Sequence, residues 1–343
     1  MFDIFLAIFL LLSPIIYLPS IPNITALQFY QFGVIDSTNF NLQLQFFQIG
    51  VIILFIVSMF SKKLRELNDR WLALSLFACL ISALLHPKSV ILFGNIFLGF
   101  LLYKLVFEYS RETGFILFSV IIASVLNFIA QIFQLFNIRF IYDFAGLMRN
   151  PSHLGTYYAL SIPIFYYFCP ILIIIPIIGL LLTKTWTAVF AVILTIGYMF
   201  RKKIKALGSV WLMFFMSIIA VAITILHKQM FNDLYPRLLI WQETLKELTF
   251  LGHGFGFKMV RLNMFDLATN TYNVYLGIFY SLGILSIPVF IWLKRTLQIR
   301  NRLYPSILII AIIGLAQSVM DFPRLAGTII VLLALMKLKG GNV

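Results

Sequence analysis

The chain has 343 residues, of which 62% are hydrophobic and 11% are charged, and its 26 Lys and Arg against 12 Asp and Glu give a formal net charge of +14. A soluble globular domain has about 25% charged residues, so this composition excludes one and indicates a polytopic membrane protein. Nucleic acid is not an expected partner, because the basic residues form short clusters between apolar runs, as they do in cytoplasmic loops. Cys79 and Cys169 lie in or beside apolar runs, so neither a disulfide nor a metal site is expected.

Apolar runs that can cross a bilayer recur along the whole chain. With ~20 residues needed per span, and shorter spans tolerated in a bundle, they predict about twelve transmembrane helices in one all-α integral membrane domain. The expected spans are residues 2–18, 42–60, 71–85, 91–107, 115–137, from about 154 onward, 171–182, 188–200, 209–226, 272–293, 307–320 and 325–336. The first run lacks a basic start and a small-residue cleavage site, so we expect an uncleaved span and not a signal peptide.

Basic clusters predict how this bundle is oriented. Residues 61–70, 201–208 and 293–302 each contain four Lys or Arg, and Lys337 and Lys339 follow the last span. The positive-inside bias makes all of these segments cytoplasmic, with both termini inside. The largest polar stretch, residues 227–271, then becomes an outer loop between the ninth and tenth spans.

This outer loop contains a predicted amphipathic helix, RLLIWQETLKEL. Leu238, Trp241, Leu245 and Leu248 recur at helical spacing, which indicates a helix lying along the membrane interface with the tryptophan at headgroup depth. Its N-terminus, beside Arg237, is a favourable place for a phosphate. The glycine-rich LGHGFGF that follows suits either a phosphate-cradling loop or, as we favour, a flexible turn back into the membrane.

Several predicted outer loops contain Lys or Arg, although positive charge is disfavoured in translocated loops. These cations suggest an anionic ligand at the outer face. Any one of them can also be a snorkelling or surface residue. His153 and His253 are each a candidate general base or a structural hydrogen-bonding residue, and their spacing does not suggest a metal site. No cofactor is expected, and no hydrolase elbow or nucleotide-binding glycine loop is present. The outer-loop cations that are candidates to bind such an anion are Arg149, Lys184, Arg237, Lys258, Arg261 and Arg324.

Four segments, in order, resemble motifs of the O-antigen ligase and polymerase superfamily. GLMRNPSHLGTYYALSIP resembles the Asn-Pro-Asn-containing start of a membrane span, and TKTWTAVFA resembles the Thr-Gly-Ser-Arg-Gly-Ala break between two spans. RLLIWQETLKELTFLGHGFGF is similar to the Arg-x-x-x-Trp helix followed by Gly-x-Gly, and YNVYLGIFYSLGILSIP to the His-Asn-x-x-Leu span. The similarity covers residues 146–288, and the layout of spans extends it to the whole chain.

The resemblance implies a metal-independent glycosyltransferase that uses undecaprenyl-diphosphate-linked oligosaccharides as donor and acceptor, at the outer face of a bacterial inner membrane. Tyr272 stands where ligases have a histidine, which favours a polymerase of a surface polysaccharide such as O-antigen or capsule. Trp186 stands where the family has an arginine, with Lys184 as a nearby substitute. A chain-length regulator protein is a further possible partner.

In this hypothesis Arg237, helped by Arg261, holds the diphosphate while an acceptor hydroxyl attacks the anomeric carbon. His253, His153 or Asp266 would accept the proton, and Tyr272 and Asn273 would order the loop or contact the sugar. Alternatives are an O-antigen ligase or oligosaccharyltransferase acting on lipid A core or protein, a transporter or flippase of the lipid-linked glycan, and a structural subunit of a membrane assembly.

Overall fold

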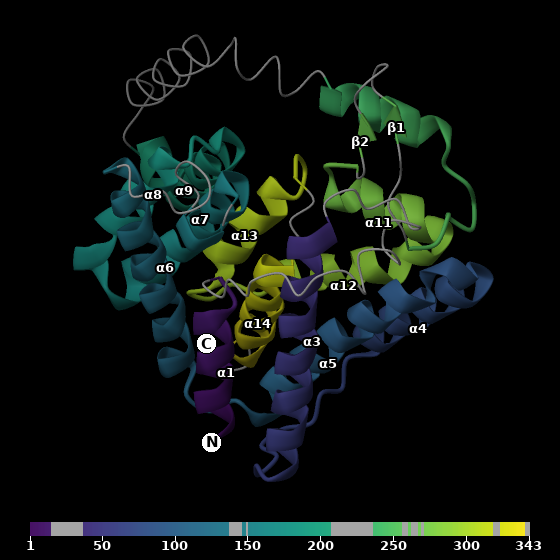
Figure 1. The fold of residues 1–343 in the computed structure, drawn as a ribbon, viewed down its shortest axis with the longest axis horizontal. Helices are drawn as coiled ribbons and strands as arrows, with labels where there is room; N and C mark the ends of the chain where they lie inside the picture. The colour runs from purple at the N-terminus through teal and green to yellow at the C-terminus, as the bar shows by residue number, and fades with distance from the viewer. Residues whose placement is uncertain are drawn as a thin grey trace.

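The computed structural model describes residues 1–14, 37–136, 146–148, 150–206, 236–255, 260–261, 267–268, 271–317 and 323–339, and these residues are mostly helical (Figure 1). The first helices are α1 (Phe2–Leu12), α3 (Ser37–Met59), α4 (Arg70–Leu85), α5 (Val90–Tyr109), α6 (Thr113–Leu135), α7 (Pro151–Phe168), α8 (Ile174–Leu182) and α9 (Trp186–Ala206). The later ones are residues 236–246, α11 (Val274–Leu282), α12 (Ile287–Leu297), α13 (Tyr304–Ile313) and α14 (Pro323–Lys339).

Short elements join these helices. The 3₁₀ turns are η1 (Pro87–Ser89), η2 (Gly146–Met148), η3 (Pro170–Leu172) and η4 (Gly283–Ser286). The expected all-α fold has one exception among the described residues, a small antiparallel pair of strands within residues 227–271. There β1 (Val260–Arg261) pairs with β2 (Leu267–Ala268), with Val260 opposite Ala268.

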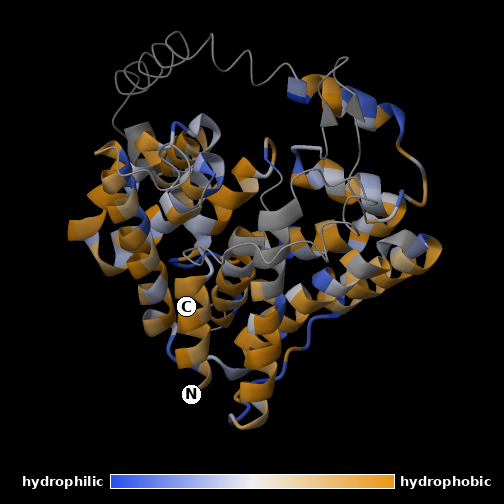
Figure 2. Ribbon diagram, in the orientation of Figure 1, coloured by the Kyte–Doolittle hydropathy of each residue, from blue (hydrophilic) through white to orange (hydrophobic). Residues whose placement is uncertain are grey.

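Three helical segments in the described part of the chain are long and apolar enough to cross a membrane: Leu92–Tyr109, Thr113–Leu135 and Val274–Leu297. Other apolar helices are shorter, and the predicted ninth span, residues 209–226, lies outside the described residues. Apolar residues dominate most helices of the bundle (Figure 2), and large apolar side chains such as Ile52 and Ile56 of α3 are about half exposed. So much exposed apolar surface suits lipid contact, whereas the count of twelve spans stays a prediction.

Contacts between helix ends gather the basic loops on one end of the bundle, here called the basic face. The Asp3 carboxylate at the start of α1 accepts hydrogen bonds from the backbone N–H groups of Arg111 and Glu112, at 3.1–3.2 Å and 3.1 Å. Lys337, near the end of α14, forms an ion pair with Asp69 before α4. The start of α1 therefore lies beside the loop of residues 110–112, and the end of α14 lies beside the loop of residues 61–69.

The loop of residues 61–69 is fastened to the same face. The buried Glu108 carboxylate, at the end of α5, lies 3.4 Å from Lys63 Nζ and accepts a hydrogen bond from Leu67 N. Arg65 donates to the carbonyl oxygen of Ser110 at 3.1 Å. On the same face, the Arg300 guanidinium donates to the Tyr198 hydroxyl near the end of α9. The loops that the positive-inside bias groups together are thus grouped in space.

The core of the bundle lies around α7, which packs against α6, α8, α9 and α13. Its side chains Tyr157, Tyr158 and Phe165 are fully buried. The helix begins where the sequence places a capping signal, because the Asn150 side chain accepts from the N–H groups of Ser152 and His153 and Pro151 occupies the first helical position. It therefore starts three residues before the predicted span.

Candidate functional site

Arg237 lies at the end of the bundle opposite the basic face. Its Nη1 donates to the carbonyl oxygen of Ala316, just beyond α13, at 2.9 Å, and its guanidinium carbon lies 5.7 Å from the centre of the Tyr272 ring. One turn later, the Trp241 indole N–H donates to the carbonyl oxygen of Thr271 at 2.8 Å. The helix of residues 236–246 is therefore fixed to the start of α11 and the end of α13.

This helix presents different faces to the bundle and to its surroundings. Ile240 and Thr244 are buried against the bundle, whereas Leu238 and Leu245 are 47% and 56% exposed. The exposed leucines form the apolar side expected of an interfacial helix. Trp241 instead turns its N–H inward, to the Thr271 carbonyl, so it acts as an anchor of the site.

The start of α11 is built by Asn273. Its side-chain oxygen accepts from Leu276 N at 3.0 Å, as a helix N-cap does, and its amide nitrogen donates to the carbonyl oxygen of Leu315 at 3.0 Å. Tyr272 has a φ of +48°, an uncommon conformation for a residue with a side chain. Because the chain turns here, the tyrosine ring reaches the Arg237 guanidinium while the asparagine remains on the helix.

Gln317 joins this cluster to α7 and α9. Its Nε2 donates to Thr187 Oγ1 at 2.6 Å, and its Oε1 accepts from Thr156 Oγ1 at 3.1 Å. No sequence motif marks this glutamine, although a polar side chain at the end of an apolar run is a signal that could have singled it out. Through Ala316 and Gln317, the ends of segments that are 79 to 161 residues apart in sequence meet in one place.

The Asn150–Pro151 segment is held by a polar stripe on α6 that the sequence analysis also missed. Asn127 Oδ1 accepts from Leu147 N at 3.1 Å, and Gln134 Oε1 accepts from Gly146 N at 3.0 Å. These two side chains lie on one face of α6, seven residues apart, and Asn127 is fully buried. They fix η2, and with it the start of α7.

The turn between α8 and α9 lies against the start of α7. Thr185 Oγ1 donates to the carbonyl oxygen of Pro151 at 3.0 Å, and a Cβ added to Gly155 would lie 2.4 Å from that same hydroxyl oxygen. Lys184 is exposed in this turn with a φ of +51°. The turn that contains Lys184 therefore lies beside the start of α7, where His153 is in the first helical turn. We call this end, with Arg237, Tyr272, Asn273 and Gln317, the motif face.

The glycine-rich segment is a packed backbone junction, so the alternative of a phosphate cradle is wrong for the glycines described. The N–H groups of His253 and Gly254 donate to the carbonyl oxygens of Tyr280 and Ser281, at 3.0 and 2.9 Å, and Gly252 N donates to Thr249 O at 3.2 Å. These donors are therefore already used. A Cβ on Gly252 would lie 2.4 Å from the Ser281 carbonyl oxygen, which explains why glycine is needed there.

His253 is part of that junction and is not next to Arg237. Its ring stacks on Tyr280 with centroids 4.4 Å apart, and its Nε2 lies 2.6 Å from the carbonyl oxygen of Glu247. Tyr280 is seven residues beyond Asn273 on α11, a rise of roughly 10 Å along the helix. These contacts fit the structural role considered for His253.

The remaining candidates can be placed only in part. Arg149, Lys258 and Asp266 lie outside the described residues. For Arg261 and Arg324 the structure describes the backbone alone, in β1 and in the first turn of α14. Of the eleven candidates, Arg237, Tyr272 and Asn273 lie together beside the end of α13. Lys184 and His153 lie in the neighbouring turn and helix start, which Gln317 joins to that end through Thr187 and Thr156.

The described residues form a mostly helical protein with three segments apolar enough to span a membrane. A cation, a phenol and an amide, those of Arg237, Tyr272 and Asn273, lie together at one end of the bundle. A scan against protein-family models finds no matching family, and a comparison with curated proteins finds no match.

Proposed function

We propose that the protein is a polymerase that joins lipid-linked oligosaccharide repeat units at the outer face of a bacterial inner membrane. The observation that supports this most is the meeting, at the motif face, of four sequence segments that resemble superfamily motifs. Arg237 and Asn273 both bind the end of α13, and Gln317 at that end binds the starts of α7 and α9.

The chemistry proposed for this face is stabilisation of a diphosphate leaving group. A guanidinium has five N–H donors in a planar fork, and the hydrogen bond to Ala316 uses one of those of Arg237. That bond and the Tyr272 ring orient the guanidinium before any ligand arrives. Fixed cations of this kind stabilise the negative charge that develops as the bond between sugar and diphosphate breaks.

The proton acceptor in this proposal is His153, not His253. His153 lies in the first turn of α7, one turn before Thr156, whose hydroxyl binds Gln317. His253 instead stacks on Tyr280, about two turns along α11 from Asn273, and its ring nitrogen lies against the carbonyl oxygen of Glu247. We therefore expect a His153→Gln variant to lose much more polymer synthesis than a His253→Gln variant.

The test is polymer synthesis by purified protein in liposomes supplied with an undecaprenyl-diphosphate-linked repeat unit. Arg237→Ala should abolish the ladder of products, because the leaving group loses its oriented cation, and Arg237→Lys should restore only part of it. Lys246→Ala is the matched control, since Lys246 is an exposed cation on the same helix and pairs with Glu243 at the surface. A normal ladder from Arg237→Ala would refute the role of this residue.

The same assay separates the alternatives. Transfer of the glycan to lipid A core or to a protein, without a ladder, would identify a ligase or oligosaccharyltransferase. Movement of the lipid-linked glycan across the bilayer without a new bond would identify a transporter. Tyr272 favours the polymerase over the ligase, because it stands where the ligase motif has a histidine, and its ring lies under the Arg237 guanidinium.

A further inference from the structure

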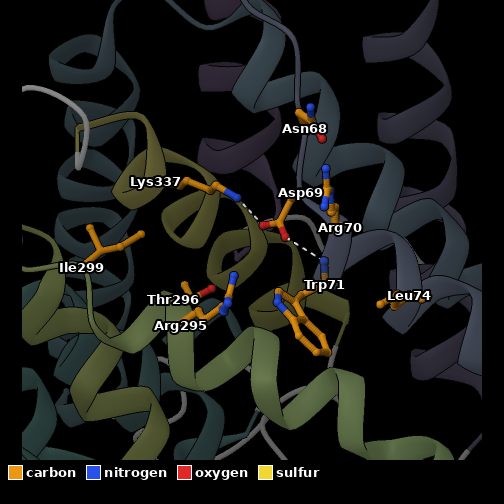
Figure 3. Close-up of a pocket in the computed structure, with 9 residues that line it drawn as sticks. All are labelled: Asn68, Asp69, Arg70, Trp71, Leu74, Arg295, Thr296, Ile299 and Lys337. Atoms are coloured by element: carbon orange, nitrogen blue, oxygen red, sulfur yellow. Dashed lines mark hydrogen bonds and ion pairs between the residues drawn. The ribbon is translucent and has the colours of Figure 1, made fainter.

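A cavity of about 650 Å³ opens on the basic face, at the end of the bundle opposite the motif face. It lies between the start of α4 and the end of α12, and Lys337 of α14 also lines it (Figure 3). The proposed glycosyl transfer makes no use of this cavity.

The charged side chains of the cavity are mainly cationic. Arg70, Arg295 and Lys337 line it together with one acid, Asp69. The Asp69 carboxylate is already engaged, because it pairs with Lys337 and accepts from the N–H groups of Trp71 and Leu72. In the described part of the chain, no carboxylate pairs with Arg70 or Arg295, so the cavity keeps a net positive charge.

Arg295 is held in place at the wall of the cavity. Its guanidinium carbon lies 5.3 Å from the centre of the Trp71 ring, which fixes the plane of the fork while leaving its edge open. Thr296 lies next to it with its hydroxyl bonded to the carbonyl oxygen of Trp292 at 2.9 Å. Figure 3 shows the Arg295 head group beside the Trp71 ring, below the Asp69–Lys337 pair, while Arg70 points to the other side, towards Asn68.

The surface beyond the cavity is apolar and exposed. Leu74 lines the cavity and is 46% exposed, and Phe77, one turn further along α4, is 59% exposed. Both side chains lie on the outside of the bundle, where a membrane protein contacts acyl chains. A ligand with a phosphate at one end and a hydrocarbon chain at the other fits this arrangement better than a free phosphate, because the cationic and apolar surfaces are continuous.

We propose that this cavity binds the head group of an anionic phospholipid, with Arg295 at the phosphate, Arg70 as a second cation on the other side of the cavity, and an acyl chain along Leu74 and Phe77 of α4. Basic cavities between transmembrane helices on the cytoplasmic side are suited to such head groups. The site requires only that the chain is embedded in a membrane, so it stands or falls independently of the proposed polymerase activity.

The experiment measures the thermal stability of detergent-purified protein as phosphatidylglycerol is added, with phosphatidylcholine and inorganic phosphate in parallel. Phosphatidylglycerol should raise the melting temperature, and the other two should not. In the double variant Arg70→Gln/Arg295→Gln, the phosphatidylglycerol concentration that gives half of the effect should rise on the order of tenfold or more, because two of the three cations that line the cavity are lost.

The control is Lys62→Gln/Lys294→Gln, which removes two cations from the same face without changing the lining of the cavity. It should respond to phosphatidylglycerol like the unmodified protein. Arg295→Lys, which keeps the charge, serves as a second variant if the double variant does not fold, and it should keep most of the response. Equal losses in the cavity and control variants would overturn the proposal, as would an equal effect of phosphatidylcholine or a full effect of inorganic phosphate alone.

Discussion

Gly252 provides the sharpest test of how the outer loop is packed. It has a φ of +74°, and a Cβ there would lie 2.4 Å from the Ser281 carbonyl oxygen and 2.7 Å from Gly283 N. A residue with a side chain in this conformation costs about 1–2 kcal/mol, and overpacking against an unyielding neighbour costs about 1–3 kcal/mol more. We therefore expect Gly252→Ala to destabilise the protein by roughly 2–5 kcal/mol.

The contact is reciprocal, which makes a double-mutant cycle informative. A Cβ on Gly283 would lie 2.2 Å from the Phe250 carbonyl oxygen and 2.5 Å from Gly252 N. Once one substitution has separated the backbones at Gly252 and Gly283, the second substitution breaks fewer of the remaining contacts between them. The combined loss for Gly252→Ala and Gly283→Ala should therefore be smaller than the sum of the single losses.

The assay is thermal unfolding of the protein in detergent, in which the single variants should melt several degrees below the unmodified protein. Gly197→Ala, in α9, is the control, because a Cβ there meets nothing within 4 Å and alanine favours a helix by about 1 kcal/mol over glycine. If Gly252→Ala melts at the same temperature as Gly197→Ala, the loop is not packed on α11 as described. Strictly additive losses would refute the direct contact of the two glycines.

Two further predictions concern helix starts. Asn273→Ala should lower the free energy of unfolding by about 1 kcal/mol, because the N–H group of Leu276 loses its capping acceptor. Asn273→Asp should keep that cap, and thermal unfolding of both variants measures the difference. Partial burial opposes the charged form of Asp69, but its hydrogen bonds from Lys337, Leu72 and Trp71 and the charge of Lys337 outweigh burial and lower its pKa. A lowered folded-state pKa contributes stability that is full above the ordinary Asp pKa of about 3.9 and is lost as the pH falls through the folded value. The Asp69→Asn variant should therefore melt at a lower temperature than the unmodified protein at neutral pH, and its melting temperature should fall less as the pH is lowered. An unchanged dependence of melting temperature on pH would contradict the pairing with Lys337.

Local patterns determined much of what the sequence could predict. Charge clusters predicted which loops share a face, and the contacts of Asp3 with Arg111 and of Lys337 with Asp69 agree with that grouping. Caps follow the same logic, since Asn150 followed by Pro151 starts α7 through hydrogen bonds within a few residues. A helix cap depends on residues a few positions apart, and the charge of a loop depends on which side of the membrane it occupies. Both can therefore be predicted from the sequence.

Only the tertiary structure decided what the segments do to one another. The sequence favoured a turn at Gly252 but left a phosphate loop open, and it left His253 as a base or a structural residue; the contacts with α11 decide for a packed turn. Gln317 carries no motif, and its importance comes from reaching Thr156 and Thr187, which are 161 and 130 residues away in the chain. Contacts at that separation depend on how whole helices pack, which no local pattern of residues specifies.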